Sequence, residues 1–479
     1  MSFESEMSSR IEKIIEAAIT ADLAGYGFYG DAESGYTGRA SATETDPIPL
    51  RDVTVAPPGA PDEGRATDEF GQEYRQGDPY FAIPFDPDEI YSAWREAIHE
   101  AFDPWLQVPD PAAFRSKINA ARQAAQTLGT STSTDGDGAD IELIAGNVRL
   151  SGDLTYLNAE ISQFNGQTVD AFHRAYVARL PVVISGQWSA AVVLGVGLTA
   201  EQEIWRRARE DLLEIADRAR EAMEAAAEGG GGGFGMLLKV LGAVASAATI
   251  FVTGGTGGAV IGGISTSLGI LGSFIPADEG GSQELEFGAD EPDEVLDKIR
   301  DGLNKLNEAI FDEEHAMRLA IMDARFELYQ PEFDLTSPAD LLGETDAADL
   351  GTAGVVDVQL ETLRSIGNQV MPAIAGELTA AAALLDSAAG DGPWTRPSSI
   401  GLGKIGFHWE WEQMYVMLTL LLPDTAWEIE EAGEHLAIAA GDLGGTDVDV
   451  AGGLQRHASE VANGSPIARE SALHGTPLR

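Results

Sequence analysis

Hydrophobic positions along this chain recur mainly at helical spacing. Between residues 86 and 228, apolar side chains return every three or four positions, beginning with Ile90, Trp94, Ile98 and Phe102. Because an α-helix turns once in about 3.6 residues, this spacing places the apolar side chains on one face. The pattern therefore predicts helices through most of this region.

A long helix is predicted over 200–228. Thr199 and Gln202 have the spacing of a capping box at its start. Five consecutive glycines at 229–233 are expected to end it, because Gly is about 1 kcal/mol less favourable than Ala inside a helix.

The second half of the chain repeats the helical pattern. Residues 296–328 carry a heptad seam of apolar positions, which predicts another long helix. A further helical region spans 355–447, and Pro423 is expected to interrupt it. By contrast, 25–85 are rich in Gly, Pro, Asp and Thr and are predicted to be mostly loop or disordered segment. The segment 141–150 is the one short strand that the pattern favours.

These elements predict a mainly α fold, an elongated antiparallel bundle of two helical-hairpin modules with a Gly-rich apolar helical hairpin between them. The expected divisions are a short helix with a largely irregular segment (1–85), a first helical module (86–228), the Gly-rich apolar hairpin (229–285), a long helix with a linker (286–354), a second helical hairpin (355–447) and a polar tail (448–479).

The stretch TIFVTGGTGGAVIGGISTSLG at 249–269 raises the main functional question. An apolar run before VTGGTGG is typical of dinucleotide-binding domains, and Gly255 and Gly257 fit the first part of G-x-G-x-x-G. Val260 occupies the third glycine position, however, and no Asp or Glu ends a plausible second strand about twenty residues on. The pattern of a phosphate-binding P-loop is also missing. A nucleotide site is therefore disfavoured, and no cofactor is expected.

The same glycines fit helix packing better. Gly254, Gly258 and Gly262 recur every four residues, which in a helix gives a smooth stripe that a second helix can approach closely. The flanking arms, 236–252 and 259–275, each have about the minimum length for crossing a bilayer. Two interpretations follow: a buried hairpin packed on the long helices, or a hairpin that inserts into a membrane.

The charge of the chain narrows the choice of partners. With 30 Lys and Arg against 78 Asp and Glu, the net charge is −48. Nucleic acids and anionic membrane surfaces attract clustered positive charge, so neither is an expected electrostatic partner. The chain has no cysteine, which excludes disulfides and thiolate chemistry. Its N-terminus lacks the basic start and apolar core of a secretory signal.

Candidate chemistry is sparse. The seven histidines show no H-E-x-x-H or other close metal spacing, so no metal site is expected. His408, Glu410 and Glu412 are close in sequence but would point apart in a helix, and the DEEH run at 312–315 is expected to be a solvated helix face. We expect no catalytic residues and a non-enzymatic protein.

The segment FNGQTVDAFHRAY at 164–176 resembles the turn and second helix of the Trp-x-Gly family, small helical hairpins exported by type VII secretion in Gram-positive bacteria. Phe164 stands in the Trp position, Gly166 in the Gly position, and Phe172 and Tyr176 in the positions of the following aromatics. The region 355–447 resembles a second, more degenerate hairpin. The chain departs from the family in having no W-x-G, and no Tyr-x-x-x-Asp/Glu export signal follows the second helix.

The resemblance implies a helical protein that is exported by, or interacts with, a type VII secretion system, with helix–helix pairing to another helical-hairpin protein or to itself. It implies a secreted or cell-surface location reached without a signal peptide, with a cytoplasmic location as the alternative. The alternative function is membrane activity, as a pore-forming or translocation protein, through the 236–275 hairpin. That arrangement looks like helical pore-forming toxins, in which a long helix, an apolar tongue and a second long helix follow each other.

Overall fold

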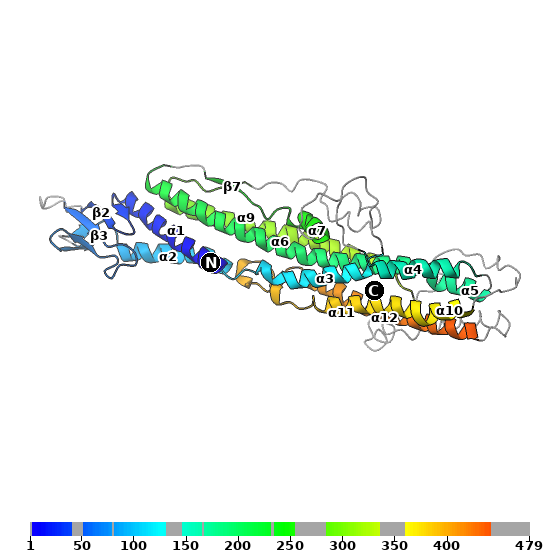
Figure 1. Cartoon of the computed structure of the whole chain (residues 1–479). Coiled ribbons are helices and arrows are strands. Elements are labelled where there is room, and N and C mark those ends of the chain that lie inside the picture. The colour runs from blue at the N-terminus through cyan, green and yellow to red at the C-terminus, as the bar shows by residue number, and fades with distance from the viewer. Residues whose placement is uncertain are drawn as a thin grey trace, which may run out of the picture.

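Long helices form most of the structure, a computed structural model that describes residues 2–40, 51–78, 81–130, 146–164, 167–230, 234–253, 284–335 and 360–441. The helices lie roughly along one axis, and a small β-sheet occupies one end of the elongated body (Figure 1). The helices are α1 (Phe3–Gly25), α2 (Pro87–Phe102), α3 (Arg115–Leu128), α4 (Val148–Ile161), α5 (Gln167–Phe172), α6 (Leu180–Ala227), α7 (Ala243–Thr253), α9 (Pro292–Leu328), α10 (Leu360–Ser365), α11 (Met371–Asp386) and α12 (His408–Gly441). The mainly α prediction is confirmed in that sense.

The central helix is α6, which contacts α1, α3, α7, α9 and α12. Every residue from 189 to 201 is buried, which explains why this stretch has almost no polar face. Its apolar window is long enough to cross a membrane but is 83% buried in the structure, as expected of a core helix.

The predicted start of this helix is wrong. Thr199 does not cap it, because its hydroxyl donates to the Gly195 carbonyl (2.9 Å) in the middle of a helix that begins at Leu180. A helix surrounded by protein on all sides has no amphipathic period, so the pattern reveals only its more exposed second half. Its predicted end is confirmed, since α6 ends at Ala227 and Gly229 has φ of +73°.

The sheet corrects the prediction that 25–85 are mostly irregular. Six short strands follow each other in chain order: β1 (Tyr29–Asp31), β2 (Gly35–Arg39), β3 (Asp52–Val55), β4 (Ala66–Asp68), β5 (Glu73–Gln76) and β6 (Ala82–Ile83). Neighbours pair antiparallel, as with Tyr36 opposite Val55, except for the parallel pair β5–β6. Strands of two to five residues are too short to show alternation in the sequence.

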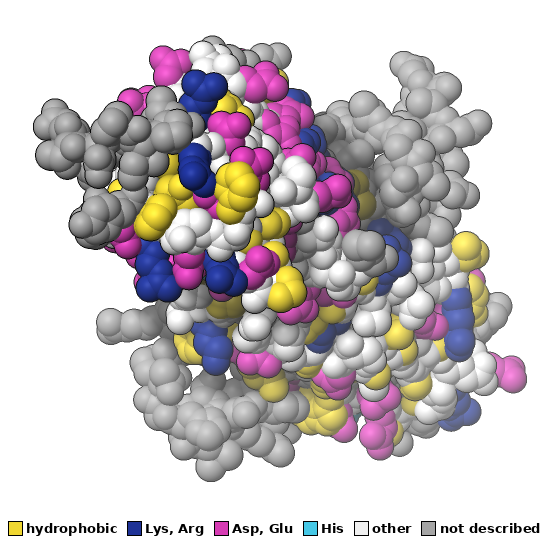
Figure 2. All heavy atoms as spheres, turned by 90° about the vertical axis from the view of Figure 1, so that its left-hand side faces the viewer, with side chains coloured by type: hydrophobic (Ala, Val, Ile, Leu, Met, Phe, Trp, Pro, Cys, Tyr) yellow, Lys and Arg dark blue, Asp and Glu magenta, His cyan; other side chains and the backbone are white. Residues whose placement is uncertain are grey.

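The sheet packs on α1 and α2 through buried side chains. Phe28, Tyr36, Val53 and Val55 are at most 1% exposed. Trp94 on α2 donates its indole N–H to the Asp22 carboxylate on α1 (2.8 Å), which joins the two helices beneath the sheet. Figure 2 views this end of the molecule and shows hydrophobic, basic and acidic side chains intermixed over it.

Two further predictions about elements are wrong. Residues 148–150, expected at the end of a strand, begin α4, where the Asn147 side chain accepts from two backbone N–H groups; residues 141–145 lie outside the described part. Pro423 does not interrupt its helix, because α12 is continuous from His408 to Gly441. Pro423 is exposed, so the carbonyl that it leaves unpaired can bind water while the buried side of the helix stays packed.

The apolar segment after α6 is only partly a helix. Residues Gly235–Leu237 form strand β7, which pairs antiparallel with β8 (Glu284–Glu286), and α7 begins after Gly242, whose φ is +78°. The prediction that the first arm, 236–252, forms one helix is therefore wrong. The second arm, 259–275, lies outside the described residues.

Candidate functional site

Helix α7 is an apolar helix held against the body by charged residues of three other helices. Glu313 of α9 binds the N-terminal end: its two carboxylate oxygens accept the backbone N–H groups of Gly242 (2.6 Å) and Val244 (2.8 Å). These are donors that a helix start leaves without intrahelical partners, so Glu313 caps α7 from outside.

The connector before α7 is bound by two residues of α6. Asp211 accepts the backbone N–H groups of Lys239 and Val240, both at 2.9 Å. Arg207 donates to the carbonyls of Lys239 and Leu241 and to the Ser246 hydroxyl (2.7 Å). Burial raises the pKa of Asp211 to about 6.

The C-terminal end of α7 is bound by Arg122 of α3. Its guanidinium donates to the carbonyls of Ile250 (3.3 Å) and Phe251 (2.8 Å) and lies 5.2 Å from the centre of the Phe251 ring. The Phe251 ring in turn lies on Gly195 of α6, where a Cβ would come within 2.0 Å of the ring. Glycine at 195 thus forms the depression that receives Phe251.

We call Arg122, Arg207, Asp211 and Glu313 the clamp residues. Together they bind backbone atoms at both ends of one short segment, and they also contact two of its side chains, the Ser246 hydroxyl and the Phe251 ring. The polar groups that hold the segment therefore belong to the body. The segment itself has Lys239 as its one charged residue between 234 and 253.

A second cluster of charged residues lies in the core. Arg396 forms a bidentate pair with Glu314 of α9, with 2.9 Å between Nη2 and Oε2, and the two side chains are 1% and 5% exposed. Glu201 of α6 lies beside them, accepts the Trp205 indole N–H at 2.7 Å, and leaves its Oε2 without a hydrogen-bond partner. Burial, and then the neighbouring Glu314 charge, raise the pKa of Glu201 to about 8.

This cluster is closed to ligands. A Cβ on Gly406 would lie 3.1 Å from Glu314 Oε1 and 3.5 Å from Glu201 Oε1, so backbone covers the carboxylates. The Arg396 guanidinium is also covered, because it lies 5.4 Å from the Trp205 ring centre and donates to the Gly403 carbonyl. The arrangement is a buried arginine–carboxylate pair beside a neutral carboxylic acid, which joins α6, α9 and the loop before α12.

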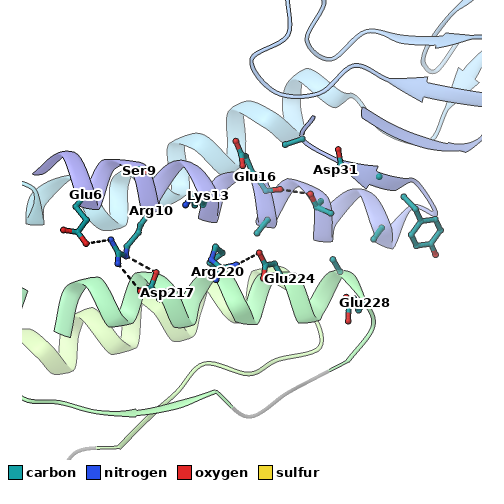
Figure 3. Close-up of a pocket in the computed structure, with 17 residues that line it drawn as sticks. Glu6, Ser9, Arg10, Lys13, Glu16, Asp31, Asp217, Arg220, Glu224 and Glu228 are labelled. Carbon is teal, nitrogen blue, oxygen red and sulfur yellow. Dashed lines mark hydrogen bonds and ion pairs between the residues drawn. The ribbon is translucent and has the colours of Figure 1, made fainter. Parts of the chain in front are cut away.

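An open cleft lies between α1 and the last turns of α6 (Figure 3). It has a volume of about 1220 Å³ and carries both signs of charge. Arg10 pairs with Glu6 and Asp217, and Arg220 pairs with Glu224, so carboxylates of the lining neutralise cations of the lining. Among the described residues no three His, Asp or Glu side chains gather as a metal site.

The predicted hairpin residues that the structure describes lie between the end of α4 and the start of α6. Phe164 is half-buried just after α4, and Phe172 and Tyr176 are buried with ring centroids 5.5 Å apart. Burial raises the pKa of Tyr176 to about 12. Gly166 lies outside the described residues, as do Gly254, Gly258 and Gly262 of the glycine stripe.

The two acidic motifs of the sequence, HWEWE at 408–412 and DEEH at 312–315, differ from the predictions in where their side chains lie. His408 is buried against Trp394, and Glu410 pairs with Arg318 of α9 (3.2 Å). Glu412 is exposed, but its Oε2 lies 4.0 Å from His408 Nδ1, so the prediction that the three residues point apart is wrong for this pair. The DEEH run is not uniformly solvated, since Glu313 is a clamp residue and Glu314 is in the buried cluster.

Sequence reasoning missed both clusters. One signal was available for the buried one, because Glu201 follows a run of apolar and small residues (Ala190 to Ala200) in which a lone carboxylate needs a partner. No local pattern identifies Arg122 or Arg396, because Phe251 and Glu314, with which they pair, lie more than eighty residues away in the chain. Comparisons with protein-family models, curated proteins and solved structures found no match to this chain.

Proposed function

We propose that the protein is a non-enzymatic, membrane-active helical protein that holds the first part of the apolar arm 236–275 on its own body, residues 236–253, and releases the arm into a lipid bilayer. The observation that carries the proposal is the clamp: charged residues of α3, α6 and α9 bind the backbone of the stored segment.

The physical reason is the cost of polar groups in lipid. A segment that entered a bilayer would have to satisfy its own backbone hydrogen bonds, and a helix does so. Since the clamp charges belong to the body, they would stay behind when the arm leaves, and the arm would carry only Lys239 with it. Release would extend α7 backward through Gly242, which now breaks the helix.

The neighbours of the arm support the same proposal. The arm connects α6 and α9, the two longest helices described, and the pairing of β7 with β8 places the start of the arm beside residues 284–286, shortly before α9. This order of long helix, apolar segment and long helix is the arrangement that looks like helical pore-forming toxins. The stripe of Gly254, Gly258 and Gly262 would let released helices pack closely within lipid.

The test is dye release from liposomes of zwitterionic lipid. Such liposomes carry no net charge, so they do not repel a chain of charge −48. We expect leakage from the wild type, more leakage from Arg122→Ala, and none from Gly258→Asp, which puts a charge in the proposed stripe. Arg300→Ala, which removes an exposed arginine distant from the clamp, is the matched control and should leak like the wild type. No leakage from any variant across pH and salt would refute the proposal.

A second candidate function is export by a type VII secretion machine, with pairing to another helical-hairpin protein. It is favoured by the break between α4 and α5 and by the buried contact of Phe172 with Tyr176. Its test is the amount of the protein in the medium of a host with and without the motor ATPase of that machine. Equal amounts retained in the cytosol of both strains would reject it.

A further inference from the structure

Helix α9 has two apolar faces, of which the fold uses only one. The inner face, which includes Ile299, Leu306, Ile310 and Ile321, is buried against α6. A second row on the outer face is exposed to solvent: Phe311, His315, Leu319, Met322, Phe326 and Tyr329. Their spacing of three or four residues places them on one face, and from Leu319 onward the alternation of three and four is that of a coiled-coil seam. We call this row the outer stripe.

The first half of the same helix shows that this row is not a general property of the surface. The outward positions that continue the stripe toward the N-terminus are Asp297, Asp301, Asn304 and Glu308, all exposed and all polar. The outer face of α9 therefore changes from polar to apolar at Phe311. The most exposed members, Phe326 at 70% and Phe311 at 52%, are large rings that a solvated helix face seldom carries.

A second exposed apolar row lies on α12, which runs beside α9. Trp409 is 60% exposed, Val416 44% and Leu420 37%. The two helices are joined by the ion pair of Arg318 with Glu410, and Ile321 and Trp411 contact the same glycine of α6, so the two rows occupy the same levels of the body. The outer stripe and this row are therefore exposed apolar rows on two adjoining helices.

The charges beside this surface are acidic. Between 308 and 327 the exposed carboxylates of α9 are Glu308, Asp312, Asp323 and Glu327. The two arginines of this stretch, Arg318 and Arg325, are half-buried, and Arg318 pairs with Glu410 of α12. Helix α12 contains no Lys or Arg at all. Flanking charges of this kind determine which helix pairs with a coiled-coil seam, because they attract opposite charges and repel like ones.

We propose that the outer stripe of α9, with the exposed row of α12, binds an amphipathic helix whose apolar face is flanked by Lys and Arg. A second copy of this chain does not fit, because it would bring the same carboxylates against these carboxylates. The inference is independent of the proposed membrane activity, since the stripe lies on the outer face of α9, away from the clamp.

The experiment measures binding of two synthetic helical peptides of about four heptads to the full-length protein by fluorescence anisotropy. Both peptides have Leu at positions a and d; one has Lys at e and g and the other has Glu. We expect the Lys peptide to bind and the Glu peptide not to bind. Phe326→Gln should lower the affinity for the Lys peptide about tenfold or more, since it removes a large apolar contact.

Two controls separate the stripe from general attraction to an acidic protein. Val148→Gln changes a residue that is 75% exposed on α4 and should leave the affinity unchanged. The double variant Asp323→Lys, Glu327→Lys should bind the Lys peptide more weakly than the wild type does, and it should bind the Glu peptide. All these positions are exposed, so we expect an unchanged Tm in each variant.

Three results would overturn the proposal. Binding of neither peptide would reject the surface, and Lys-peptide binding that Phe326→Gln does not weaken would reject the site. Self-association of the full chain that Phe326→Gln abolishes, seen by sedimentation, would assign the stripe to a second copy instead.

Discussion

Glu201 has a carboxylate oxygen that accepts no hydrogen bond in the buried centre of the body. Arg396, the nearest cation, already forms a bidentate pair with Glu314. One arginine cannot neutralise two buried carboxylates, so Glu201 holds its proton, in agreement with its pKa of about 8. The consequence is a pH-dependent stability that a solvated glutamate would not produce.

We predict that Glu201→Gln makes the protein more resistant to unfolding at alkaline pH. The native state keeps the Glu201 proton up to about pH 8, whereas the unfolded chain releases it near the ordinary value of 4.5. The free energy of unfolding therefore falls as pH rises through this window, by up to a few kcal/mol. Gln keeps the acceptor for Trp205 and cannot ionise, so Tm values of the two proteins should agree at pH 5 and diverge at pH 8.5. Parallel curves would show that Glu201 is ionised in the native state.

A second prediction concerns Arg396. Replacing it with Met leaves Glu314 buried and unpaired, which we expect to reduce the free energy of unfolding by about 3–5 kcal/mol in urea denaturation. The double variant Arg396→Met, Glu314→Leu removes both charges and should recover much of this loss. Equal losses in the single and double variants would mean that the pair does not interact as described.

At the scale of elements, α7 shows how a short helix is stored by shape as well as by charge. Phe251 fills the depression at Gly195, and Arg122 lies over the outer side of the same ring. The helix has 11 residues, too few to be stable alone in water, so its packing and its clamp residues maintain it.

We predict that Gly195→Ala displaces α7 without unfolding α6. The added methyl group would lie 2.0 Å from the Phe251 ring, so the ring must move. Hydrogen exchange at residues 243–253 should become faster by about tenfold or more, whereas the rest of α6 should stay protected. Gly376→Ala on α11 is the control: nothing lies within 4 Å of its added Cβ, and this change should stabilise the protein by about 0.5–1 kcal/mol.

Prediction from sequence succeeded for elements with one solvated face. The seam of α9 and the glycine end of α6 were readable because apolar periodicity and Gly act locally. The first half of α6 was not readable, because a helix buried on all sides loses its period. The sheet was missed because its strands are short, and the clamp was missed because Arg122 and Phe251 meet only through the tertiary fold. Charged residues at such long-range contacts carry no local signature.

At the scale of the whole molecule, the net charge of −48 affects folding as well as choice of partner. Many of the described carboxylates are exposed, and the body is narrow and elongated (Figure 1), so they repel one another across it. The ion pairs of the described part, such as Arg10 with Asp217, offset only some of this repulsion.

We predict that Tm rises as NaCl increases from about 0.1 M to about 1 M, because the Debye length falls from about 10 Å to about 3 Å and screens this repulsion. KCl should act like NaCl, which distinguishes screening from binding of one cation. A Tm that is unchanged or lower at high salt would show that surface ion pairs outweigh the repulsion.

The 48-residue helix α6 also sets the mechanics of the molecule. At 1.5 Å per residue it is about 72 Å long, and it runs along most of the long axis without a break (Figure 1). A rod of this kind has no hinge in its middle, so the sheet end and the opposite end must turn together. Fluorophores placed near the two ends of α6 would then report one narrow distance distribution, and the whole body would tumble in solution as a single stiff rotor.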